Sequence, residues 1–107
     1  MVIHDEGGTQ LILSRMRNHP YNANIQHYGC AALQNLAMNE KSKTTIAEAG
    51  GITTILSAMK THSFNSKVQY LCIAALSNLA DKNENNKVMI AAAGGDSTIV
   101  FVMKKEV

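Results

Sequence analysis

The stretch GGITTILSAMKTHSFNSKVQYLCIAALSNLA, residues 50–80, decides the fold because the chain contains it twice. A shift of 43 residues places it over GGTQLILSRMRNHPYNANIQHYGCAALQNLA, residues 7–37, and 15 of the 31 aligned positions are identical. The register then slips by one residue, so that residues 44–51 match residues 88–95. A fixed period of this length is typical of a stacked array, in which no unit can bury its apolar face alone.

The repeat divides the chain into a partial repeat 1–6, a repeat 7–49, a repeat 50–93 and a partial repeat 94–107. Each complete unit is expected to hold three helices. Apolar residues recur at helical spacing from Ile52 to Met59, after the Gly50–Gly51 pair, and this pair and its copy Gly7–Gly8 are expected to turn the chain sharply.

The longest helix of each unit follows a break at residues 61–64 or 18–21. Its apolar stripe in the second unit consists of Val68, Cys72, Ala75, Leu76 and Leu79. Asn22 and Asn65, or the residues directly after them, stand where a helix N-cap belongs. A short third helix is expected over residues 42–49 and again over residues 85–93.

The composition excludes several classes of protein. Of the 107 residues, 46% are apolar and 17% are charged, and the net charge of +2 is too small to indicate a nucleic-acid partner. The longest apolar run is far too short to cross a membrane. Two cysteines do not make a disulfide framework, and they favour a reducing compartment. We therefore expect a soluble all-α protein in the cytoplasm, with the nucleus left open.

The sequences AGGITTIL (49–56) and VQYLCIAALSNLA (68–80), with their copies at 6–13 and 25–37, resemble the armadillo repeat. HEAT and related helical repeats are close neighbours of this pattern. The resemblance covers nearly the whole chain, and it implies a right-handed α-α superhelix of three-helix repeats. It also implies a non-catalytic scaffold that binds an extended peptide, or a disordered segment of another protein, on the concave face of the long helices.

In the armadillo family this groove commonly carries an asparagine one turn after a tryptophan. Asn35 and Asn78 match the asparagine, whereas Ala31 and Ala74 stand where the tryptophan would be, which disfavours a receptor for nuclear-localisation signals. The predicted groove is made of Asn24, Tyr28, Ala31, Asn35, Lys67, Leu71, Ala74 and Asn78. The alternative is that the two asparagines only bond to a neighbouring backbone.

No set of residues predicts catalysis, a cofactor or a metal site. Cys30 and Cys72 are expected to be structural, and His19 and His62 are expected to serve the turn between helices. Residues 81–92 fail as a calcium loop, because Asn86 and Ala92 replace the required glycine and glutamate. The basic residues are expected on solvated outer faces: Arg15, Arg17, Lys41, Lys43, Lys82, Lys87, Lys104 and Lys105.

The end of the sequence supports a second hypothesis. Ile99, Val100 and Met103 repeat the apolar stripe of Ile55, Leu56 and Met59 without the long helix that should cover them. Either the chain is an excerpt from a longer array, or its ends pair with other copies in a dimer or a filament. The alternative function is thus a self-assembling structural module.

Overall fold

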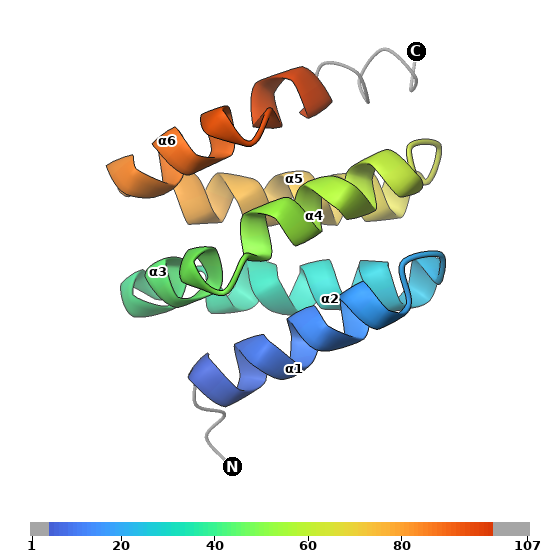
Figure 1. The fold of residues 1–107 in the computed structure, drawn as a ribbon, viewed down its shortest axis with the longest axis horizontal. Helices are drawn as coiled ribbons and strands as arrows, with labels where there is room; N and C mark the ends of the chain where they lie inside the picture. The colour runs from blue at the N-terminus through green and yellow to red at the C-terminus, as the bar shows by residue number, and fades with distance from the viewer. Residues whose placement is uncertain (1–4, 100–107) are drawn as a thin grey trace.

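The computed structural model describes residues 5–99, which are helical throughout with short turns between the helices and no strand. Six helices follow one another: α1 (Asp5–Asn18), α2 (Ala23–Leu36), α3 (Glu40–Glu48), α4 (Gly51–Thr61), α5 (Ser66–Ala80) and α6 (Glu84–Ala92). Residues 95–99 are helical as well. Figure 1 shows the parallel long helices α2 and α5 behind α1 and α4, with α3 and α6 at one side. The expected all-α architecture is confirmed.

Asparagine side chains cap the N-termini of α2, α3, α5 and α6, as expected for the long helices α2 and α5. Asn22 Oδ1 accepts a hydrogen bond from the backbone N–H of Ile25 at 3.0 Å, and Asn65 Oδ1 accepts one from Val68 at 3.1 Å. Asn39 and Asn83 cap α3 and α6 in the same way. The two short helices therefore begin one or two residues earlier than the apolar pattern predicted.

The glycine pairs turn the chain into α4 and into residues 95–99, and the two glycines of each pair have different roles. The first glycine of each pair is left-handed, with φ +83° at Gly50 and +80° at Gly94. The second lies against the end of the preceding short helix, because a Cβ atom on Gly51 would stand 2.8 Å from the carbonyl oxygen of Ile46.

The expectation of a similar turn at Gly7 and Gly8 is wrong. Both glycines lie inside α1, which starts at Asp5, and a Cβ atom on Gly7 would meet nothing within 4 Å. A left-handed residue is needed only where one helix stops and the chain reverses into the next, and here a single helix continues through the pair.

A buried glutamine closes the turn between the first two helices of each unit. The Gln26 side-chain amide donates to the carbonyl oxygens of Met16 at 3.0 Å and His19 at 2.9 Å. Gln69 repeats these bonds with Met59 at 2.9 Å and His62 at 2.6 Å. The repeat thus includes a glutamine whose side chain satisfies the carbonyl groups at the end of α1 and α4.

One hydrophobic core runs through both repeats. Leu13 and Met16 of α1, Leu33 of α2, and Ile55 and Met59 of α4 are all buried in it. Ile46, Val68, Leu76 and Leu79 continue the same cluster through α3 and α5. The two repeats are therefore joined by shared apolar contacts and do not form separate bodies.

Candidate interaction surface on the long helices

The eight residues predicted to line the groove lie on α2 and α5, which pack side by side (Figure 1). Within each helix they recur at steps of four, three and four residues and so share one face, opposite the buried Leu33 of α2 and Leu76 of α5. All eight are exposed or half-buried: Asn24, Tyr28, Ala31 and Asn35 on α2, and Lys67, Leu71, Ala74 and Asn78 on α5. The structure thus brings the predicted residues together on one accessible surface, which we call the α2–α5 surface.

Tyr28 is the largest apolar group on this surface. Its side chain is 69% exposed, and its ring meets the ring of His27 edge to face, with the centroids 4.8 Å apart. Tyr28 therefore presents an aromatic ring to solvent on this surface.

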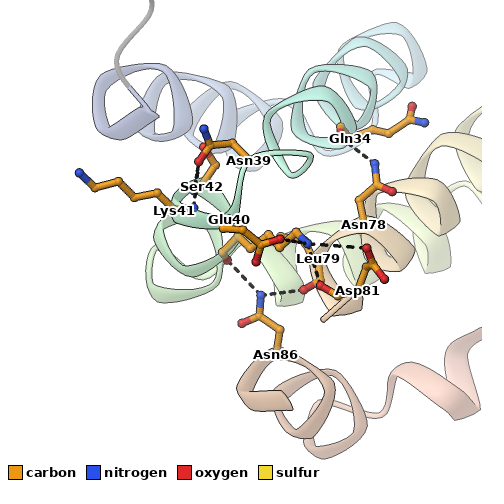
Figure 2. Close-up of polar contacts among 10 residues, drawn as sticks. Gln34, Asn39, Glu40, Lys41, Ser42, Asn78, Leu79, Asp81 and Asn86 are labelled. Atoms are coloured by element: carbon orange, nitrogen blue, oxygen red, sulfur yellow. Dashed lines mark hydrogen bonds and ion pairs between the residues drawn. The ribbon is translucent and has the colours of Figure 1, made fainter. Parts of the chain in front are cut away.

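The two asparagines of the surface differ in their bonding. The Asn78 side-chain N–H donates to the carbonyl oxygen of Gln34 at 2.9 Å, and so joins α5 to the preceding long helix (Figure 2). Asn35 is exposed, and its side chain makes no hydrogen bond within residues 5–99. For Asn78 the structure therefore shows the alternative role, a bond to a neighbouring backbone, while the Asn35 amide is left with its full capacity for donating and accepting.

A second cross-repeat contact lies close to the first, at the C-terminal end of α5. Lys43 of α3 is only 3% exposed, and its Nζ donates to the carbonyl oxygen of Asp81 at 2.7 Å and to Glu40 Oε1 at 3.1 Å. Asn86 of α6 donates to the carbonyl oxygens of Lys43 at 3.1 Å and Leu79 at 2.9 Å, as Figure 2 shows. These bonds tie α3, α5 and α6 together where α5 ends.

The expectation of a solvated outer face is therefore wrong for Lys43 and incomplete for Arg17. Arg17 donates through Nη2 to the carbonyl oxygen of Ala49 at 2.7 Å and through Nε to Thr54 Oγ1 at 3.0 Å. Both cations satisfy carbonyl groups at helix ends, where positive charge is favourable. Charge spacing alone could not reveal this, because Lys87 occupies the matching place in the next repeat and is half exposed.

The cysteines and His62 have the structural roles that the sequence predicted, whereas the His19 side chain is exposed. Cys30 and Cys72 are fully buried, and their sulfur atoms are 2.7 Å apart. The hydrogen bond to Cys30, together with burial, raises the pKa of the Cys72 thiol above its ordinary value, so it stays protonated. His62 meets the carbonyl oxygen of Pro20 through Nε2 at 2.9 Å, across the turns of the two repeats.

The described part of the chain holds no group of three or more His, Cys, Asp or Glu residues that could bind a metal ion. Among the same residues no helix is both long and apolar enough to cross a membrane.

An apolar hollow of about 400 Å³ lies at the α1 end of the array, beside the α2–α5 surface. Leu11, Ile12, Ile25 and Tyr28 supply its apolar lining, and Leu11 is 61% exposed. At the opposite end Ile99 is half-buried and packs against the core, whereas Val100 and Met103 lie outside the described residues.

The family model described as LRRK2 ARM repeat matches residues 1–106 of the chain. Neither the curated proteins nor the solved structures give a significant match. The family match agrees with the duplicated sequence, the helical units and the glycine turns described above. The chain therefore belongs to the LRRK2 ARM repeat family, a family of armadillo repeats.

Proposed function

We propose that the chain is a non-catalytic interaction module that holds an extended peptide, or a disordered segment of another protein, along the α2–α5 surface. Armadillo repeats commonly mediate protein interactions and generally act as scaffolds. The observation that carries the proposal is the free side-chain amide of Asn35, which lies at the C-terminal end of the accessible stripe on α2. A right-handed superhelical arrangement, and a place in the cytoplasm or nucleus, belong to the same proposal.

The chemistry of the α2–α5 surface is suited to bind the backbone of a peptide more than any one of its side chains. An asparagine amide can donate to a peptide carbonyl and accept from a peptide N–H at once, which fixes an extended backbone irrespective of its sequence. Tyr28 and Leu71 supply apolar contact, and the short side chains of Ala31 and Ala74 leave room between them. Lys67, exposed at the start of α5, favours an acidic group at that end.

The test uses a display library of random linear peptides, selected on the wild-type chain. The affinity of the best peptide is then measured by fluorescence polarisation for wild type, Asn35→Ala and Tyr28→Ala. We expect Asn35→Ala to weaken binding about tenfold, the loss of one or two hydrogen bonds.

Tyr21→Ala is the matched control, since Tyr21 is 85% exposed but lies in the turn before α2. Its affinity should equal that of wild type. A library that yields no binder, or a peptide that binds equally to all variants, would overturn the proposed surface.

A second candidate function, self-association, is favoured by the apolar hollow beside α1. The counterparts of Ile12 and Ile25 in the second repeat are Ile55 and Val68, which are fully buried because the first repeat covers them. Another copy of the chain that covered Leu11 and its neighbours would remove similar apolar area from water.

Light scattering on a size-exclusion column, over about a hundredfold range of concentration, tests this second function. Leu11→Lys should convert an assembly into monomers, whereas Met38→Lys, on a side chain 74% exposed in the α2–α3 turn, should not. Val100→Lys with Met103→Lys probes the other end of the sequence. A wild-type monomer throughout the range would contradict self-association.

A further inference from the structure

The two cysteines of the chain meet in the core between the repeats. Cys30 of α2 and Cys72 of α5 are both fully buried, and their Sγ atoms are 2.7 Å apart. A disulfide bond measures about 2.05 Å, so the sulfur atoms would close on each other by a shift of only about 0.7 Å.

This meeting is not a property of the repeat itself. Cys30 corresponds to Ile73 in the next unit, and Cys72 corresponds to Gly29 in the preceding one. The cysteines are 42 residues apart, one short of the repeat period, and this offset places them on the two sides of α2 and α5 that face each other. Two positions at which the repeats differ thus place a thiol pair at a single interface.

We propose that Cys30 and Cys72 form a reversible intramolecular disulfide when the chain meets a low-molecular-weight disulfide such as oxidised glutathione. The thiolate of one cysteine attacks the small disulfide, forms a mixed disulfide and releases one small thiol. The second cysteine then attacks the protein sulfur of the mixed disulfide, and the second small thiol leaves. The two protein thiols lose two hydrogens, and the small disulfide is reduced to two thiols.

Burial controls the rate of this reaction. Neither sulfur is accessible in the closed core, so the first attack requires a transient separation of α2 from α5. The protonated state of Cys72 also slows the first attack, since a thiol is a poor nucleophile. The oxidised form then closes over the bond and shields it from reducing thiols. The modification would respond slowly to oxidant and would hold the two long helices together.

The experiment measures the equilibrium constant for disulfide formation with oxidised and reduced glutathione, in native buffer and in concentrated urea. Mass spectrometry under non-reducing conditions counts the chains that have lost two hydrogens. If the folded structure favours the bond, the constant should be at least about 100-fold larger in native buffer than in urea, and the oxidised chain should melt about 10 °C higher.

Cys30→Ser and Cys72→Ser are the matched controls, because each retains one thiol and can form only a mixed or an intermolecular disulfide. An equilibrium constant in native buffer equal to or below the value in urea would overturn the proposal, since it would mean that the fold resists the bond. A native product that consists only of mixed disulfides would overturn it too. Neither readout depends on whether the α2–α5 surface binds a peptide.

Discussion

Two asparagines at matching places in successive repeats have different partners. The Asn78 side chain donates to the carbonyl oxygen of Gln34, while the Asn35 side chain has no hydrogen-bond partner in the described part of the chain. Because both lie inside a helix, replacement by alanine improves helix propensity equally at the two sites. We expect Asn78→Ala to be less stable than Asn35→Ala by about 1 kcal/mol, the net value of a partly buried hydrogen bond. Urea unfolding of the two variants measures the difference, and equal stabilities would contradict the role assigned to Asn78.

Lys43 and Lys87 form a second matched pair at the residue scale. Lys43 is buried and bonds to the carbonyl oxygen of Asp81, whereas Lys87 is half exposed and, within residues 5–99, has Glu84 as its only side-chain ion pair. Lys43→Met should lower the free energy of unfolding by about 2 kcal/mol, because it leaves a carbonyl group without its charged donor. Lys87→Met should change it by less than about 0.5 kcal/mol. Comparable losses in the two variants, by thermal or chemical unfolding, would show that the buried bond adds nothing.

The Cys72 thiol predicts a pH dependence of stability. The folded chain keeps it protonated, while the unfolded chain releases the proton as the pH passes the ordinary thiol pKa of about 8.5. The contribution of the protonated Cys72 thiol to the free energy of unfolding is thus complete below that pH. Above it, this contribution is lost at up to about 1.4 kcal/mol per pH unit. Urea unfolding of the reduced chain between about pH 8 and pH 10 measures the slope. In Cys72→Ala the slope should be smaller, and an unchanged slope would assign the effect to other groups.

At the scale of the helices, the turn into α4 depends on Gly50. A side chain there would require a left-handed backbone, and the flexible Arg17 side chain, whose Nη2 lies 2.7 Å from the position of a Cβ atom, would have to shift. Gly50→Ala should therefore cost about 1–2 kcal/mol. Gly7→Ala is the opposite case, since Gly7 lies within α1 with open space around it, and it should stabilise by about 0.5–1 kcal/mol. Thermal unfolding distinguishes the two, and a neutral Gly50→Ala would contradict the strain argument.

The helices were predictable from the sequence to within one or two residues wherever an apolar stripe and a cap occur together, as in α5. The exposure of the α2–α5 surface was also predictable, since Asn35 and Tyr28 lie opposite the stripe. The partners of individual polar groups were not. Lys43 and Lys87 have similar neighbours in sequence, and only the tertiary arrangement places a following helix end over Lys43. The turn predicted at Gly7–Gly8 is wrong for a similar reason, because a pair of glycines forms a turn only where one helix ends and the next begins.

At the scale of the whole molecule, the shared core predicts one cooperative transition instead of separate melting of the two repeats. Leu33 of α2 is fully buried in a cluster that extends through both units. Leu33→Ala should lower the free energy of unfolding by about 3 kcal/mol and leave the denaturant slope unchanged. Circular dichroism and tyrosine fluorescence report on different parts of the chain, and their urea curves should coincide. Curves that separate would contradict the single transition.

The order of helix contacts has a further consequence, for the response of the chain to mechanical tension. Each helix makes its main contacts with helices no more than three elements away along the chain, such as α2 with α5 and α3 with α6. A force applied at the two ends of such an array is resisted only by the contacts of the outermost unit, and not by all interfaces in parallel. The molecule would therefore unfold one repeat at a time at modest force. When the force is released, each helix could refold against the neighbouring helix that remains folded.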